Sequence, residues 1–335
     1  GKYTKDKLNL YGMGGLSSIK YSYQDHFTVA NEVVKADAIS TFQVKGGIMY
    51  DVDDNVSVFA NTGYVEKPPI MDNVIYYDGT VASDPINESF ISSEAGVNFE
   101  SEKFAVKVSA YNTDWKDRNL TKSVTTGQGS SGDTDVIFLK GIGQKHQGLE
   151  IEGSMKLNDM IRLDGAVSFG KWKFDGDADG LYTEYDEEAP KQTSYTYTLD
   201  GLFVGDQPQT AYVLGTTLTP MDGLRLQGIF KMYDKNYADW SPDSRELSGD
   251  ADRSQVWQAP AYNRLDLHAA YKLPKIAGYD MTLTGHLFNA LDAVYVQDAV
   301  DNSQYNGWGK SHLASDAEVF LGTPRYFNLG LTVNF

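Results

Sequence analysis

The sequence is built from segments in which apolar and polar residues alternate one by one, and the last of them, GTPRYFNLGLTVNF (322–335), shows this most clearly. Its apolar positions are separated by single residues that are mostly small or polar; they are Phe327, Leu329, Leu331, Val333 and Phe335. Because successive side chains of a β-strand point to opposite faces, this segment predicts a strand with one apolar face. A half-buried strand of a water-soluble sandwich shows the same pattern, so the alternation alone leaves two classes of fold open.

The alternation recurs along the chain, with charged residues on the second face. In GLEIEGSMKL (148–157) and RLDLHAAYKL (264–273), acidic and basic residues alternate with large apolar ones. No helical period of useful length appears, so we predict an all-β, antiparallel domain over residues 1–335. About twelve strands are expected, at residues 7–23, 37–51, 55–65, 90–100, 103–117, 144–156, 160–173, 209–219, 223–237, 260–273, 279–291 and 323–335.

The connections between these strands alternate between short and long. Tight connections such as DVDDN (51–55), ESEK (100–103) and LNDM (157–160) are each followed by a long one. The long connections are 24–36, 66–89, 118–143, 174–208, 238–259 and 292–321. A soluble sandwich has no reason to place every long loop at one end, whereas transmembrane β-barrels have short periplasmic turns and long external loops.

Charge and composition agree with a barrel. The formal net charge is −17, which argues against nucleic acid as a partner. The long connections together carry more negative charge than the whole chain, so the strands and short turns are close to neutral. Strand faces that carry both Arg and Glu cannot face lipid. We therefore predict that the charged faces line a lumen and that the apolar faces contact outer-membrane lipid.

Four stretches resemble the TonB-dependent outer-membrane receptors. They are the closing strand GTPRYFNLGLTVNF (322–335), the hairpin and proline-bearing loop 42–74, GQKHQGLEIEG (143–153) and HLFNALDAVYVQDA (286–299). Lys67 stands where the family usually has Arg, and Ala290–Leu291 where it usually has Leu–Phe, so no family role is assigned to these positions.

The resemblance implies the C-terminal half of a barrel of about 22 strands, whose N-terminal plug is not in this chain. A complete barrel of about twelve strands is the alternative that strand number allows. It also implies the outer membrane of a Gram-negative bacterium, energy from the TonB–ExbB–ExbD complex through the plug, and assembly by the barrel assembly machinery. The terminal aromatic strand (Phe327, Leu329, Leu331, Val333, Phe335) would be the assembly signal.

One acidic stretch has the spacing of a calcium loop. In DGDADGLYTEYDEE (175–188), Asp175, Asp177 and Asp179 occupy positions 1, 3 and 5 of an EF-hand-like loop, and Asp186 occupies position 12. Calcium takes six to eight hard oxygen ligands, which this spacing can wrap around an ion. A solvated acidic loop has the same composition. The sequence thus offers Ca²⁺ in loop 175–187 as its one candidate cofactor.

The segment 235–260 is the predicted ligand-contact loop, because it combines aromatic and cationic side chains. A small-molecule substrate would contact Tyr237, Trp240, Arg245, Arg253 and Trp257, together with Trp308 of a neighbouring long connection. No histidines have the spacing of a metalloprotease, but His268 and His286 fall on inward faces of neighbouring strands and are expected to approach each other.

The resemblance implies an active transporter that takes up a scarce nutrient, with a ferric siderophore as the first candidate. Uptake of an oligosaccharide is the alternative within the family, suggested by the loop tryptophans and tyrosines. Two alternatives belong to other functional classes: a soluble β-rich binding protein and an outer-membrane enzyme. Because no nucleophile with an oriented base can be assembled from the sequence, we predict that the chain is not an enzyme.

Overall fold

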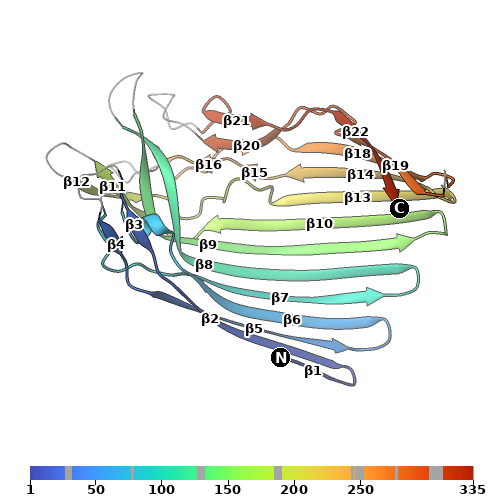
Figure 1. The fold of residues 1–335 in the computed structure, drawn as a ribbon, viewed down its shortest axis with the longest axis horizontal. Coiled ribbons are helices and arrows are strands. Elements are labelled where there is room, and N and C mark those ends of the chain that lie inside the picture. Colours follow the sequence, from blue (N-terminus) through green and yellow to red (C-terminus); the bar gives the residue numbers. More distant parts are fainter. Residues whose placement is uncertain are drawn as a thin grey trace.

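The computed structural model describes residues 1–26, 32–76, 79–126, 133–184, 191–242, 245, 253–275, 278–301 and 312–334. These form one large, strongly curved antiparallel sheet with smaller hairpins at one end (Figure 1). No helix in the described ranges is long and apolar enough to cross a membrane. The structure includes a single 3₁₀ turn, η1 (Met71–Asn73), in the connection between β6 (Val56–Lys67) and β7 (Glu88–Glu100).

All twelve predicted strands lie in the main sheet, and each pairs with the next in chain order. Their bounds are β2 (Leu8–Ile19), β5 (Ile39–Asp51), β6 (Val56–Lys67), β7 (Glu88–Glu100), β8 (Phe104–Thr126), β9 (Asp133–Lys156), β10 (Ile161–Phe174), β13 (Thr210–Met221), β14 (Leu224–Asp234), β18 (Tyr262–Lys272), β19 (Asp280–Phe288) and β22 (Tyr326–Asn334). A further strand, β1 (Lys2–Lys5), pairs with β2 and was not predicted. The sheet order runs from β1 to β22, and in the described residues these two edges do not pair with each other.

Short and long connections lie at opposite ends of the sheet, as the sequence predicts (Figure 1). The turn between β13 and β14 shows why its sequence suits a tight connection. Gly223 has a φ of 80°, and a Cβ there would lie 3.1 Å from the carbonyl oxygen of Lys272. Glycine occupies such left-handed positions without the steric cost that other residues meet.

The long connections contain more regular structure than the sequence indicated. Residues 118–143 were expected to be a loop, but β8 and β9 continue beyond the sheet as a paired hairpin, with register shifts between Trp115 and Leu120. The β8 part of this extension, residues 118–126, is mostly polar, and hydrogen bonds between paired strands need no apolar period, so its sequence concealed the strand.

Short strands also occur within the other long connections. They are β3 (Ser22–Gln24), β4 (Val33–Lys35), β11 (Ala178–Glu184), β12 (Lys191–Tyr197), β15 (Asn236–Tyr237), β16 (Asp239–Trp240), β17 (Gln258–Ala259), β20 (Val296–Asp301) and β21 (Ala317–Leu321). β11 pairs with β12 and with the extension of β9, and β16 pairs in parallel with β20. Segments from four different connections are thus tied together at this end.

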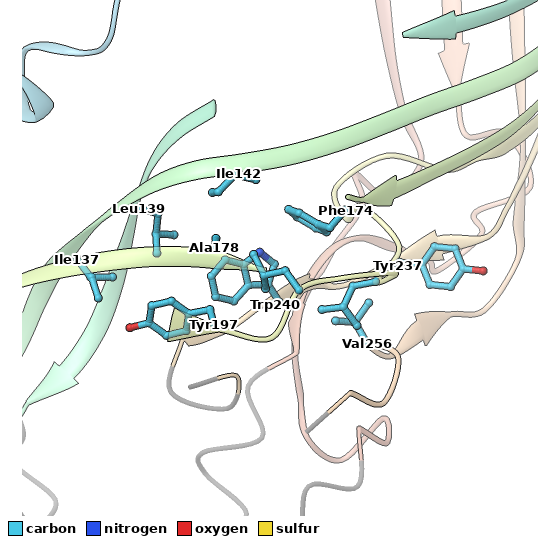
Figure 2. Close-up of a cluster of buried hydrophobic side chains, with 11 residues drawn as sticks. Ile137, Leu139, Ile142, Phe174, Ala178, Tyr197, Tyr237, Trp240 and Val256 are labelled. Atoms are coloured by element: carbon cyan, nitrogen blue, oxygen red, sulfur yellow. The ribbon is translucent and has the colours of Figure 1, made fainter. Parts of the chain in front are cut away.

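The main hydrophobic core lies among these connections and not within the sheet. It includes Ile137, Leu139, Phe174, Leu199 and Trp240, all less than 5% exposed (Figure 2). The outer face of the sheet instead exposes large apolar side chains: Leu16 is 90% exposed, Phe327 72% and Leu329 75%. A contiguous exposed apolar face of this kind needs an apolar surrounding.

Candidate functional site

One face of the sheet carries a continuous row of polar side chains. Residues directly opposite each other on paired strands share a face, so the strand register identifies the row. It crosses seven successive strands, from β9 to β22, at Lys156, Arg162, Thr217, Gln227, His268, His286 and Asn328. A hollow of about 1200 Å³ lies over part of it and is lined by Lys156, Arg162, Thr217 and Gln227. The polar face is therefore the concave, lumen-side wall.

The neighbouring row, one residue along each strand, belongs to the opposite face and is mainly apolar. It contains Met155, Leu163, Thr216, Gly228, Leu267, Leu287 and Phe327. Along β22, Phe327, Leu329, Leu331 and Val333 stand opposite Leu287, Gly285, Leu283 and Met281 of β19. The closing strand therefore has the single apolar face that its sequence predicts; Phe335 lies outside the described residues, and the assembly role stays a prediction.

The connections at the other end fold into a cap, which we define as residues 174–184, 191–209, 236–242, 245 and 253–259 together with the extension of β8 and β9. Its centre is Trp240, whose ring meets Phe174 edge-on at 6.4 Å and Tyr197 at 5.6 Å between ring centroids. Lys122 lies over the same ring at 5.2 Å and forms an ion pair with Asp239. The cap is thus a packed unit with its own aromatic core (Figure 2).

Several predicted ligand-contact residues belong to this packed interior. Trp240 is 2% exposed and Tyr237 is 9% exposed, with the Tyr237 ring stacked on Phe203 at 4.3 Å. Arg245 is fully buried; its Nη1 donates to the carbonyl of Ser254 at 2.6 Å, and its own carbonyl accepts from Thr198. In the described arrangement these three side chains hold the cap together and present almost no surface to a ligand.

Arg253 and Trp257 are the members of the predicted set that reach the surface. Arg253 is exposed and Trp257 is half-buried, with its backbone N–H donating to Asp301 at 2.9 Å. Trp308 lies outside the described residues. Ligand contact by the predicted residues stays a prediction. Of those that the structure describes, Arg253 and Trp257 are accessible and lie at the edge of the cap.

Arg253 and Asp177 join two connections of the cap through a double hydrogen bond. Arg253 Nη1 and Nη2 donate to Asp177 Oδ1 and Oδ2 at 3.1 and 2.8 Å, and Asp177 also accepts the backbone N–H groups of Leu199 and Asp200. The hydrogen bond from Arg253 is the main cause that lowers the pKa of Asp177. Asp177 is therefore ionised and fully engaged by the protein.

The other residues of the predicted calcium loop are arranged around a hairpin. Asp179 lies in β11 and accepts a hydrogen bond from Thr196 at 2.9 Å, whereas Asp175 lies just before the hairpin, with its N–H bonded to Gly143. Asp186 lies outside the described residues. Within the described ranges no group of three histidine, cysteine or acidic side chains is placed to hold a metal ion. Calcium binding by loop 175–187 stays a prediction.

A second acidic group, made of Asp206, Asp239 and Asp298, lies among the long connections. Partial burial is the main cause that raises the pKa of Asp206 to about 7, and the neighbouring carboxylates of Asp239 and Asp298 add to it, although part of the residue faces solvent. Asp206 also has a φ of 68°, which places it in the left-handed region that Asp tolerates. This residue can change its charge near neutral pH.

Glu88 is the central residue of a polar network that was not predicted from the sequence. It is fully buried at the start of β7 and accepts hydrogen bonds from Lys67 Nζ, Trp115 Nε1 and the N–H of Asn119, each near 3.2 Å. The sequence placed Glu88 in a long connection. Extending the alternation of β7 backward would have brought it into the strand.

Comparisons with known proteins agree with this architecture. The model of the TonB-dependent receptor-like β-barrel family matches residues 3–290. Solved structures with the same fold include the copper transporter OprC (12% identity, TM-score 0.63, 97% of this chain and 46% of that one). Others are the ferric-catecholate import receptor Fiu from E. coli K12 (14%, 0.59, 98% and 42%) and the FrpB iron transporter from Neisseria meningitidis (15%, 0.58, 98% and 43%). No curated protein sequence matches the chain.

The chain spans less than half the length of each of these solved proteins. At such low identity the structural similarity shows the fold alone, and the family model provides the family. These relatives are receptors and transporters, in agreement with the prediction that the chain is not an enzyme. Because the β-barrel model of the family matches most of its residues, the chain belongs to the TonB-dependent receptor family.

Proposed function

We propose that this chain is the C-terminal barrel wall of a Gram-negative outer-membrane receptor that imports a scarce nutrient, most readily a ferric siderophore. The observation that carries the proposal is the pairing of two faces: a polar row along a hollow on one side, and exposed large apolar side chains on the other. A wall with one polar and one apolar face separates an aqueous passage from lipid.

The strand lengths support a membrane location. A transmembrane β-strand needs about 9–11 residues. The two shortest of the twelve strands, β19 and β22, have nine residues each. Outer-membrane lipid would then cover the face that carries Phe327 and Leu329. Assembly by the barrel assembly machinery and energy from the TonB–ExbB–ExbD complex, acting through a plug, belong to the same proposal.

The substrate class is proposed from the cap and from the relatives. Fiu is described as a ferric-catecholate import receptor, BauA as the ferric preacinetobactin receptor and FrpB as an iron transporter. Sugar uptake would use exposed aromatic rings for stacking, and of the predicted rings Tyr237 and Trp240 are buried whereas Trp257 is half-buried. The cargoes named for the relatives therefore support a ferric siderophore as the first candidate, with OprC making copper the competing cargo to test.

The experiment that tests this proposal measures the amount of the full-length receptor in outer-membrane fractions of its native host. Cells are grown with an iron chelator, with a copper chelator or with neither. The proposal predicts a rise of several-fold under iron limitation alone. A rise under copper limitation alone would contradict iron as the cargo, and absence from the outer-membrane fraction would contradict the location.

A further inference from the structure

Two histidines face each other on the lumen-side wall, where the sequence expected them to approach. His268 of β18 and His286 of β19 are directly opposite in the strand register, and their Nδ1 atoms are 2.8 Å apart. The ring planes meet at 61° with centroids 5.0 Å apart. At this distance one neutral ring donates its Nδ1 proton and the other offers its lone pair. A metal ion can replace that shared proton, because neutral imidazole nitrogen is a metal ligand.

The two nitrogens are close enough to bind one ion together. With metal–nitrogen bonds of about 2.05 Å, two ligands lie ~2.9 Å apart at 90° and ~3.3 Å apart at a tetrahedral angle, so a small shift from the observed 2.8 Å hydrogen bond reaches either geometry. Cu²⁺ binds nitrogen ligands more tightly than Ni²⁺ or Zn²⁺ in the general order of divalent-metal affinities, which favours copper at this pair.

Aromatic side chains beside the pair hold the two rings in place. Phe288 meets His268 edge-on at 5.5 Å and stacks on His286 at 6.0 Å, and Tyr326 stacks on Phe288 at 4.7 Å. These contacts limit how far either imidazole can turn from the other.

Amide side chains flank the pair in the same polar row. Gln227 stands opposite His268, and Asn328 stands opposite His286. The Nε2 of Gln227 donates to Thr217 at 3.3 Å, so its amide oxygen is the free acceptor of that group. Such oxygens can bind the waters of a hydrated ion.

The carboxylate next to the pair on β18 is already engaged by cationic side chains of the protein. Asp266 lies two residues before His268 on β18 and so shares its face of the sheet. It accepts hydrogen bonds from Lys231 Nζ and from the N–H of Asn289, both at 2.9 Å. Arg264 Nη2 lies 3.6 Å from the same carboxylate. Asp266 is thus occupied, and the two imidazoles are the protein ligands that remain.

We propose that His268 and His286 form a two-histidine site for a borderline divalent cation, with Cu²⁺ bound more tightly than Zn²⁺. Two protein nitrogens leave the other coordination positions to water, so the ion exchanges readily with the lumen. This matches the finding that no three metal-ligating side chains of the described residues converge. The site depends on the wall alone and is independent of which nutrient the receptor imports.

The test uses the full-length receptor without a histidine tag, purified in detergent and titrated with Cu²⁺, Ni²⁺ or Zn²⁺ alone. We expect one copper site whose electron paramagnetic resonance spectrum shows coupling to two imidazole nitrogens. His268→Gln and His286→Gln should each weaken copper binding at least tenfold. His146→Gln is the matched control, because His146 lies on β9 and stacks on Trp172 at 5.4 Å.

Two results of the titrations would overturn the proposed copper site. One is an unchanged copper affinity in both glutamine variants, and the other is tighter binding of Zn²⁺ than of Cu²⁺. The spectrum of the unmodified receptor provides a test that does not depend on how the variants fold. A wild-type copper signal without coupling to two imidazoles overturns the site, and one with that coupling, lost only in the His268 and His286 variants, establishes it.

Discussion

Lys67 and Glu88 form an ion pair across β6 and β7, with Lys67 Nζ 3.2 and 3.3 Å from the two carboxylate oxygens. Glu88 is fully buried, whereas the Lys67 side chain is 49% exposed. Lys67 therefore reaches from the surface to a carboxylate that also accepts from Trp115 Nε1 and from the N–H of Asn119. The strand carrying Glu88 and the start of the β8 extension are joined through one side chain.

We predict that Glu88→Gln destabilises the receptor by roughly 1–3 kcal/mol, because an amide cannot accept all of these hydrogen bonds and leaves a buried donor unpaired. The measurement is thermal unfolding of the full-length receptor in detergent. Lys67→Arg is the control, since Arg keeps a positive charge within reach of the carboxylate. Equal unfolding temperatures for wild type and Glu88→Gln would contradict the role given to Glu88.

Trp240→Ala is expected to loosen the cap and leave the wall folded. Replacing a buried Trp by Ala typically costs about 3–5 kcal/mol, and Trp240 lies at the centre of the cap. The Trp240 Nε1 is buried, with no hydrogen-bond partner in the described residues, so Trp240→Phe should retain most of the stability. Limited proteolysis should cut the cap of Trp240→Ala first. Equal protection of the two variants would show that the cap does not depend on this ring.

The Arg253–Asp177 pair should contribute little to global stability and should respond to pH in one direction. Asp177 has a lowered pKa in the folded state, so its contribution is present above its unfolded pKa, near 3.9, and is lost as the pH falls through the folded value. Because Arg253 is exposed and Asp177 is only partly buried, we expect a coupling energy below about 1 kcal/mol in a double-mutant cycle of Asp177→Asn and Arg253→Gln. A coupling that grows with added salt would contradict a direct ion pair.

Asp206 should give the cap the opposite pH dependence. Its folded pKa, raised to about 7, lies above the unfolded value, so the folded state binds the proton more tightly. Stability from this group is fully present below about pH 4 and falls as the pH rises through 7. Asp206→Asn should make the cap's protease resistance less dependent on pH between about 5 and 8. An unchanged pH profile in that variant would rule out Asp206 as the titrating group.

The wall was predictable because its pattern is local. Each strand alternates within its own residues, so the closing strand 322–335 and its apolar face could be derived from that stretch alone. The approach of His268 to His286 followed once both were placed on inward faces of neighbouring strands. The distance of 2.8 Å between their Nδ1 atoms required the structure.

The cap was not predictable because its core is assembled from distant segments. Ile137, Phe174, Tyr197, Trp240 and Val256 come from three different connections, and no sequence period links them. An aromatic residue in a loop has the same sequence signature whether it stacks on a ligand or packs in a core. Tyr237 and Trp240 were predicted to contact ligand for this reason, and the structure places both in the interior of the cap.

Uptake of radioactive iron supplied as purified ferric siderophores tests the central claim most directly. Native-host cells lacking this receptor are compared with cells in which the full-length receptor is restored, each with and without a functional TonB. Our account predicts that uptake of at least one ferric siderophore returns only when both the receptor and TonB are present. The account is contradicted if removing and restoring the receptor leaves the uptake of every tested siderophore unchanged.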